Sequence, residues 1–130
     1  MKTHKDLDVW NKSMELVTAI YQLTKYFPKE ETYGLTNQIR RSAVSVPSNI
    51  AEGAARKHNK EYIQFLYIAL GSASELETQL LIAKNLNYYN EEQSTLLLDR
   101  NDRVRKMLVG LIKSVQNRNA KPVTRHQSLT

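Results

Sequence analysis

Basic side chains are the residues of this sequence whose chemistry and spacing point to a function. From Arg100 to Arg125 the sequence carries eight cationic side chains and a single acid, Asp102. From Arg40 to Lys60 it carries five cationic side chains and a single acid, Glu52. Such clusters are typical of a surface that binds the phosphates of a nucleic acid. The alternative is that the net charge of +6 only keeps a small protein in solution.

The candidate nucleic-acid-binding residues are cations for which the expected helices offer no acidic partner. Most of them fall on the last expected helix and on the segment after it, where Arg103 and Lys106 share one outward face. Lys57 and Lys60 extend this surface at one end of the molecule. The full set is Arg100, Arg103, Arg105, Lys106, Lys113, Arg118, Lys121, Arg125, Lys57 and Lys60. We expect RNA or another nucleic acid to be the partner.

Arg40 and Arg41 allow two interpretations. As adjacent, permanently charged guanidinium groups they could bind phosphate. They could instead be counter-ions between two helices. If the chain reverses direction just after residue 56 as an antiparallel helical hairpin, residues whose numbers sum to about 115 lie at the same height. Arg40 and Arg41 then lie opposite Glu75 and Glu77, and we favour structural ion pairs among these four residues.

The residues that catalysis would need are missing. Di-iron helical bundles use Glu-x-x-His pairs, and none of His4, His58 and His126 has a glutamate three residues before it. There is no cysteine, and no histidine within an expected helix could activate a serine. No glycine-rich phosphate loop is present. We therefore expect no catalytic residue, no metal and no cofactor.

Residues 35–56 are expected to form a helix that positions the first basic cluster. Apolar residues recur there at steps of three and four, which is the spacing of one helical face: Leu35, Ile39, Ala43, Val46, Ile50 and Ala54. Pro47 lies within this pattern, where it should cost roughly 3 kcal/mol. A kinked helix packed on both sides would offset this cost. The alternative is two short helices that separate at Ser45.

A second helix is expected from Asn59, and it predicts an oligomer. Its seam alternates steps of four and three, at Tyr62, Leu66, Ala69, Ala73, Leu76, Leu80 and Ala83. No residue from Tyr62 to Ser74 is charged, so apolar or small side chains surround the helix. Such a helix is buried on all sides. We therefore expect another subunit to cover its outer face, at an interface that includes Tyr67, Gly71 and Ser74.

Two further helices complete the expected fold. One begins after Asp6 and ends at Pro28. The other begins at a capping-box pattern formed by Asn90 and Gln93, with a seam at Leu97, Val104, Leu108, Leu111 and Val115. The sequence thus predicts an all-α, antiparallel, up-and-down four-helix bundle over residues 6–115. Residues 1–5 are expected to form an N-terminal tail, and residues 116–130 a basic C-terminal tail.

Composition predicts one domain in the cytoplasm. A chain of 130 residues with 41% apolar residues can bury a core without disulfides. The absence of cysteine suits a reducing compartment. No apolar run approaches the ~18 residues that span a bilayer, and no signal-peptide core follows the first residues. We expect no membrane partner.

Several motifs together resemble a known family. They are Leu7–Trp10, Gln38–Arg41, Ser45–Gly53, Ile68–Ser72 and Glu75–Glu77. These segments are similar to the four-helix-bundle proteins encoded by open reading frames in 23S rRNA intervening sequences. The resemblance covers roughly residues 6–115, and it implies a ring-shaped homopentamer. It also implies two contexts: insertions in rRNA genes, and the related accessory variability determinants that assist a reverse transcriptase in diversity-generating retroelements.

These observations lead to two hypotheses. The first is a non-catalytic, oligomeric RNA-binding scaffold or accessory protein, in which the basic surfaces of the subunits add together around a ring. A reverse transcriptase is a further possible partner of such a protein. The second is a structural ring for protein–protein interaction, without a nucleic-acid role.

Overall fold

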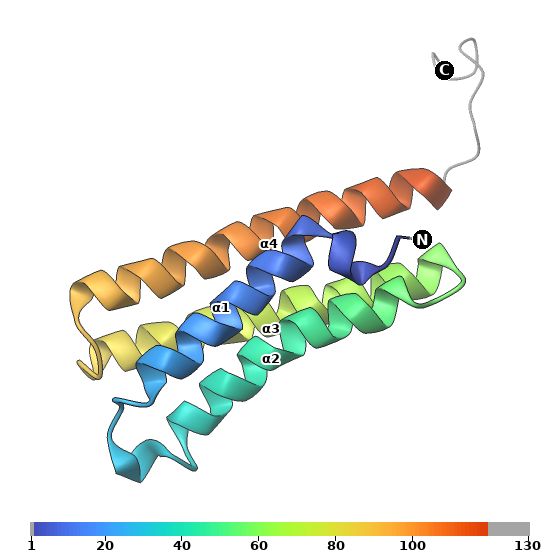
Figure 1. The fold of residues 1–130 in the computed structure, drawn as a ribbon. Coiled ribbons are helices and arrows are strands. Elements are labelled where there is room, and N and C mark those ends of the chain that lie inside the picture. The colour runs from blue at the N-terminus through green and yellow to red at the C-terminus, as the bar shows by residue number, and fades with distance from the viewer. Residues whose placement is uncertain (1, 120–130) are drawn as a thin grey trace.

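The computed structural model describes residues 2–119, which form α-helices and short 3-10 helices without a β-strand among them. The helices are α1 (Asp8–Thr24), α2 (Leu35–Ala54), α3 (Asn59–Asn85) and α4 (Glu91–Asn119). Two 3-10 helices, η1 (His4–Asp6) and η2 (Lys29–Glu31), precede α1 and α2. Figure 1 shows the four α-helices running back and forth along one long axis. Because α1 and α3 each contact α2 and α4, the predicted four-helix bundle is confirmed.

The core lies along the seams that the sequence predicted. All seven predicted seam residues of α3 are buried, and Leu66, Leu76 and Leu80 have no exposed surface. On α4, the predicted seam is buried except at Leu111, which is half-buried. Ile112 takes its place in the core, because a straight helix with 3.6 residues per turn drifts away from a strict heptad.

α2 is one continuous helix with Pro47 inside it, as the favoured interpretation predicted. Pro47 is buried, as are its apolar neighbours Val46 and Ile50, so packing offsets the missing backbone hydrogen bond. Near the end of α2, a Cβ atom on Gly53 would lie only 2.8 Å from the Cβ of Phe65 in α3. Glycine at this position therefore lets the two helices approach closely beside their connecting turn.

Local hydrogen bonds fix the helix ends. The predicted capping box at the start of α4 is present: Asn90 N donates to Gln93 Oε1 at 3.1 Å, and Gln93 N donates to Asn90 Oδ1 at 2.7 Å. At the start of α2, Leu35 N donates to the Glu31 carboxylate at 3.1 Å. The Tyr88 hydroxyl donates to the other Glu31 oxygen at 2.6 Å. Glu31 thus ties η2 both to α2 and to the turn between α3 and α4.

The ends of the chain differ from the sequence-based boundaries. Residues 4–6 form η1, which Thr3 and Asp6 close with their own capping box. α4 continues beyond Val115 to Asn119, because the exposed side chains after Val115 neither add to the apolar pattern nor break the helix. Within residues 2–119, none of the helices has the length and apolar content needed to cross a membrane.

Candidate nucleic-acid interface

The ten predicted nucleic-acid-binding residues fall into distinct settings. Lys121 and Arg125 lie outside the described residues. Arg105 and Lys106 form ion pairs on α4, whereas Arg100 and Arg103 line a groove beside α1. Lys57, Lys60 and Arg118 gather at one end of the bundle. Lys113 is exposed on α4 between the groove and that end.

Arg105 has a structural role that the sequence did not indicate. Its Nη1 lies 3.7 Å from Glu77 Oε1 on α3, and its Nη2 lies 3.5 Å from Asp102 Oδ1 on α4. The side chain is partly buried, and its Nε has no hydrogen-bond partner among the described residues. Arg105 therefore bridges α3 and α4, so the expectation that it has no acidic partner is wrong, and its contact with phosphate stays a prediction. Lys106 also pairs with Asp102, at 3.0 Å, but its side chain remains 76% exposed.

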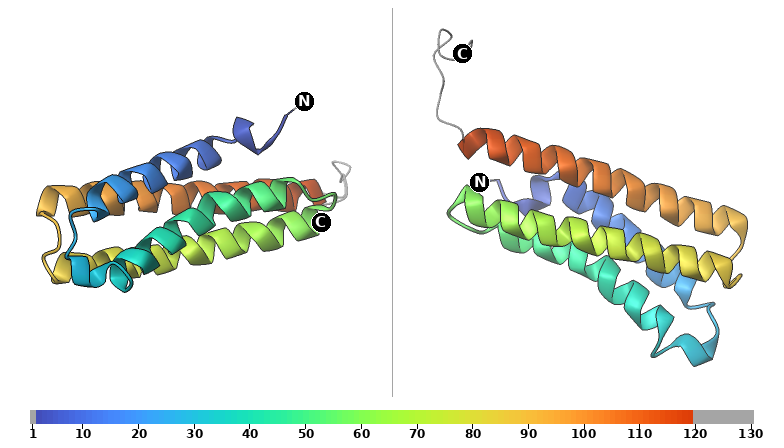
Figure 2. Two further views of the ribbon diagram at one scale, coloured as in Figure 1. Left: turned by 60° about the horizontal axis from the view of Figure 1, so that its bottom comes forward. Right: turned by 180° about the vertical axis from the view of Figure 1, so that it is seen from behind.

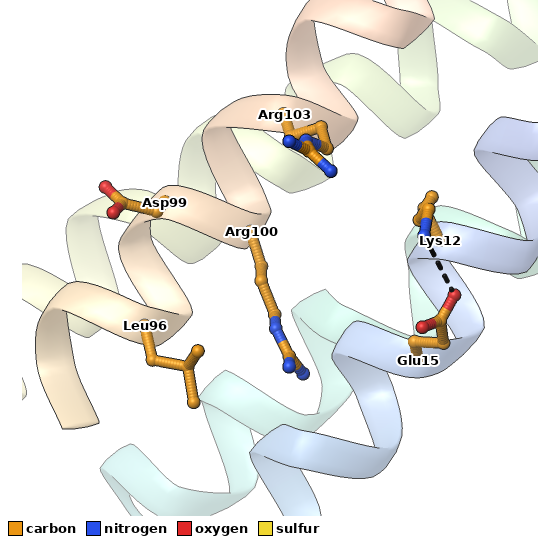
Figure 3. A pocket seen from close by; sticks show the side chains of 6 residues that line it. All are labelled: Lys12, Glu15, Leu96, Asp99, Arg100 and Arg103. Carbon is orange, nitrogen blue, oxygen red and sulfur yellow. Dashed lines mark ion pairs between the residues drawn. The ribbon is translucent and has the colours of Figure 1, made fainter.

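Arg100 and Arg103 line a groove of about 340 Å³ between α1 and α4 (Figure 3). Figure 3 shows the Arg100 side chain extending from α4 toward α1, where Lys12 and Glu15 form an ion pair at 3.6 Å. Asp99 also lines the groove. Three cations and two carboxylates leave a single net positive charge here. The groove is therefore only weakly attractive to a polyanion.

The other predicted cations come together at one end of the bundle. Figures 1 and 2 show the N-terminus, the α2–α3 turn and the C-terminal end of α4 at the same end in all three views. Lys57 belongs to this turn, Lys60 lies in the first turn of α3, and Arg118 lies in the last turn of α4. Burial raises the pKa of Tyr62 in the first turn of α3, and the charge of Arg118 opposes this shift. Arg118 is therefore near the start of α3.

Lysines from the start of the chain join this group. Lys2 and Lys5 line a cleft of about 380 Å³ together with Ala54 and Ala55 from the end of α2. We call the resulting surface the basic end, which consists of Lys2, Lys5, Arg56, Lys57, Lys60 and Arg118. Sequence reasoning missed Lys2, Lys5 and Arg56 as members. Only the packing of η1 against α2 brings the first two beside the turn.

The bundle is electrically polar along its length. The six cations of the basic end have four carboxylates near them, Asp6, Asp8, Glu52 and Glu61. Glu52 is paired with Arg56 at 2.7 Å. The opposite end of the bundle has three cations and four carboxylates, which are Lys25, Lys29, Lys84, Glu30, Glu31, Glu91 and Glu92. Six minus four gives a net charge of +2 at the basic end, and three minus four gives −1 at the opposite end.

The ion pairs predicted between α2 and α3 are wrong. Arg40 turns toward α1, where its Nε donates to Thr24 Oγ1 at 2.9 Å and its guanidinium lies 4.5 Å from the centre of the Tyr21 ring. Glu75 instead accepts a hydrogen bond from the Ser42 hydroxyl at 2.6 Å. Glu77 is the partner of Arg105 on α4.

The pairing expected from an antiparallel hairpin of α2 and α3 is wrong for a geometric reason. Observed contacts join Ser42 to Glu75 and Ser45 to Ser72, so facing numbers sum to 117. Such a sum fixes only the height along the helix, whereas successive residues are rotated by about 100° around its axis. Arg40 therefore faces α1. Arg41 lies beside α3 instead, in a polar groove between α2 and α3.

The predicted interface residues all lie on α3 surface that other parts of the subunit leave open. Tyr67 is 51% exposed, as is its neighbour Ile68. A Cβ atom added to Gly71 would meet no atom within 4 Å. Ser74 lines a shallow apolar groove with Leu70 and Val109.

Comparison with known proteins identifies the family. Residues 5–110 match the family model described as 23S rRNA-intervening sequence protein. The chain belongs to this family. The match confirms the predicted resemblance, and it includes the bundle and most of α4 but ends before Arg118.

A solved structure is similar to the chain in sequence and in fold. It is the crystal structure of a protein with unknown function from the S23 ribosomal protein family of Bacteroides thetaiotaomicron VPI-5482. It is 29% identical in sequence, with a TM-score of 0.76, and the similarity covers 81% of this chain and 98% of that chain. No curated protein matches the chain. The comparisons therefore show the family of the chain and support its fold.

Proposed function

We propose that this chain is a non-catalytic RNA-binding scaffold of the cytoplasm that meets RNA through its basic end. The observation that carries the proposal is the gathering of six cations from the N-terminal segment, the α2–α3 turn and α4. RNA binding of this kind depends on phosphate neutralisation and the release of counterions, and it needs no catalytic group. The family description, which refers to 23S rRNA intervening sequences, favours RNA as the polyanion.

Assembly of several subunits would supply the affinity that one basic end lacks. A net charge of about +2 per subunit gives weak binding, but linked subunits act together on one RNA strand. The half-exposed Tyr67 and Ile68 and the open surface at Gly71 support an interface along the outer face of α3. We propose a ring-shaped homopentamer. Cyclic symmetry gives every subunit the same direction relative to the axis, so bundles aligned with it would present their basic ends on one face.

A structural ring without a nucleic-acid role is the second candidate, because the apolar face of α3 would support it equally well. The absorbance ratio of purified protein at 260 and 280 nm separates the two candidates. For the RNA scaffold, we expect bound nucleic acid that leaves in high salt, and salt-sensitive binding of added RNA. Protein that is free of nucleic acid and does not bind added RNA at low salt would support the purely structural ring.

The proposed scaffold could act in either of the two contexts that the resemblance implies. In an rRNA context its RNA would be the transcribed insertion itself. In a retroelement context it would also contact a reverse transcriptase. Co-purification of the protein with a reverse transcriptase encoded beside its gene tests the second context. Repeating the co-purification after nuclease treatment shows whether the contact between the two proteins depends on RNA.

A further inference from the structure

We infer that the polar groove between α2 and α3 is a pocket for one unstacked guanine base. The groove has a volume of about 360 Å³, which is within the usual range of ligand pockets. It lies apart from the basic end, and the inference rests on the proposed function only in taking RNA as the source of the base. The groove would recognise a base of an RNA strand whose phosphates bind at the basic end.

Hydrogen-bond acceptors line the α3 side of the groove. Gln79 is only 8% exposed, and its Oε1 has no hydrogen-bond partner among the described residues. One turn earlier, Glu75 Oε1 accepts the Ser42 hydroxyl at 2.6 Å, which holds the carboxylate in place. This oxygen is buried, and buried polar atoms are normally paired, so a donor that enters the groove would satisfy it once the Gln79 amide turns toward the groove that its side chain lines. The Glu75 carboxylate, and the Gln79 amide oxygen once the amide has turned, are two neighbouring acceptor groups.

A strong donor lines the same groove from α2. Arg41 contacts the groove, and its guanidinium forms no ion pair within residues 2–119. A guanidinium group presents planar, paired N–H donors of fixed geometry. Beside it, the hydroxyl groups of Ser45 and Ser72 bond to each other at 2.8 Å across the two helices. The groove therefore combines a donor fork on one helix with acceptors on the other.

Guanine matches this arrangement better than the other bases. Its O6 and N7 atoms accept the two N–H groups of an arginine, the commonest specific contact to a base. Its N1–H and N2–H₂ groups are adjacent donors for the Glu75 carboxylate and the Gln79 amide oxygen. Adenine would place an unprotonated ring nitrogen against these acceptors. Proteins read RNA sequence mainly from unstacked bases whose edges are accessible in this way.

The position of the groove fits a strand held at the basic end. Ser45 and Lys57 are twelve residues apart on one helix and its following turn, or about 18 Å at the rise of an α-helix. A few nucleotides span such a distance. Phosphates at the basic end would thus fix a strand whose next unstacked base enters the groove.

Guanosine and adenosine 5′-monophosphate test this pocket, because they carry the same phosphate and differ only in the base. Each is titrated into ¹⁵N-labelled full-length protein. We expect only the guanine nucleotide to shift the amide resonances of Ser72, Glu75 and Gln79, with at least about tenfold tighter binding than the adenine nucleotide. Shifts common to both nucleotides report phosphate binding elsewhere, for example at Lys57 and Lys60.

Two variants sharpen the test. Arg41→Gln removes the guanidinium from an exposed position, and we expect it to weaken guanosine monophosphate binding about tenfold or more. Glu75→Gln removes the carboxylate and should have a similar effect. Lys25→Gln is the control, an exposed cation outside both the groove and the candidate nucleic-acid-binding set, and it should leave this binding unchanged. Circular dichroism confirms that each variant is folded.

The inference is overturned by equal binding of the two nucleotides, by shifts confined to the basic end, or by full binding to the Arg41→Gln variant. It is also overturned if the groove resonances respond to protein concentration and not to nucleotide, since a second copy of the chain would then fill the groove. These outcomes would leave salt-sensitive RNA binding intact. Failure of the proposed function would instead show as loss of that RNA binding while the guanine nucleotide still enters the groove.

Discussion

Asn101 of α4 donates a hydrogen bond from its Nδ2 to the carbonyl oxygen of Ala73 in α3, over 2.8 Å. Asn101 is 1% exposed, and it lies on the apolar seam of α4. The small Ala73 side chain lets the amide reach the backbone of the neighbouring helix. A buried asparagine with a defined partner fixes the height at which two helices pack. This contact therefore sets the register of α4 on α3.

Asn101→Asp tests this contact. The substitution removes the donor and buries a carboxylate beside a carbonyl oxygen, so we expect the free energy of unfolding at pH 7 to fall by about 3 kcal/mol or more. Burial raises the pKa of the new carboxyl, so the folded state binds more protons than the unfolded state, and the loss shrinks as pH falls. Denaturant unfolding at several pH values measures this loss in the free energy of unfolding. Asn101→Leu is the control, with an expected change below about 1.5 kcal/mol; equal stability of the two variants would contradict the prediction.

Gly53 is expected to tolerate no larger side chain. A Cβ atom there would lie 2.8 Å from Phe65 Cβ and 3.0 Å from Tyr62 Cδ1. Overpacking of this kind costs about 1–3 kcal/mol, and it outweighs the gain of up to about 1 kcal/mol in helix propensity. Gly53→Ala should therefore lower the free energy of unfolding, whereas Gly110→Ala, which meets no atom within 4 Å, should raise it. Thermal or denaturant unfolding that gives both substitutions the same sign would refute this account of the α2–α3 approach.

The pKa of Glu31 should depend on Tyr88. The hydrogen bond from the Tyr88 hydroxyl, and then that from Leu35 N, lower the pKa of Glu31 below its ordinary value of 4.5. A carboxyl group whose pKa is lower in the folded state stabilises the protein at pH values above its unfolded-state pKa. This stabilisation is lost as the pH falls through the folded-state pKa. Tyr88→Phe should therefore raise the pKa of Glu31 and flatten the acid limb of the stability curve. Carbon-detected NMR titration of the Glu31 carboxyl measures the shift.

Tyr89→Phe is the matched control for this titration. The Tyr89 hydroxyl donates to the Leu80 carbonyl at 2.7 Å and makes no hydrogen bond to Glu31. Its removal should leave the Glu31 titration unchanged. An unchanged pKa of Glu31 in the Tyr88→Phe protein would show that the hydrogen bond does not govern this carboxyl.

Gly71 provides a test of assembly that is independent of folding. The space beside it is open within the subunit, so Gly71→Trp should preserve the bundle. If the outer face of α3 is a subunit interface, the indole ring should disrupt the assembly, and native mass spectrometry would then record monomers. Gln116→Trp adds the same ring to exposed surface of α4 and should not change the mass. An intact assembly with Trp at position 71 would place the interface elsewhere.

Local rules were enough to predict the bundle. Burial of one helical face imposes the three-and-four spacing seen from Tyr62 to Ala83, so the seam of α3 could be identified residue by residue. The start of α4 was equally clear, because the capping box of Asn90 and Gln93 uses only groups within one turn. Pro47 was placed correctly in a single helix, since an uninterrupted apolar pattern on both sides requires one.

The candidate interface depends on relationships that no local rule contains. Lys2 and Arg118 come from opposite ends of the chain, and only the folded bundle brings them to the same end. The partner of Arg40 depends on the direction of its side chain around α2, and the number of residues to the turn does not determine that direction. The acidic partner of Arg105 could not be predicted for a related reason. Its partner Glu77 comes from α3, and the packing of α4 on α3 decides the pair.

The central claim is that RNA binds at the basic end, and a pair of charge reversals tests it most directly. Lys57→Glu with Lys60→Glu reverses two charges at the basic end, and Lys25→Glu with Lys29→Glu reverses two at the opposite end. The 29 residues of α4 span about 43 Å, far more than the roughly 8 Å Debye length at physiological salt. Each pair of reversals therefore acts only at its own end.

The measurement is fluorescence anisotropy of a single-stranded RNA across a salt series, with native mass spectrometry to confirm the same assembly in all proteins. We expect the first double variant to weaken binding at least about tenfold and to make the slope of log affinity against log salt shallower by roughly 1.4 per subunit, at about 0.7 per phosphate contact. The second should retain the affinity and slope of the unsubstituted protein. Equal losses in both variants, or no loss in either, would contradict RNA binding at the basic end.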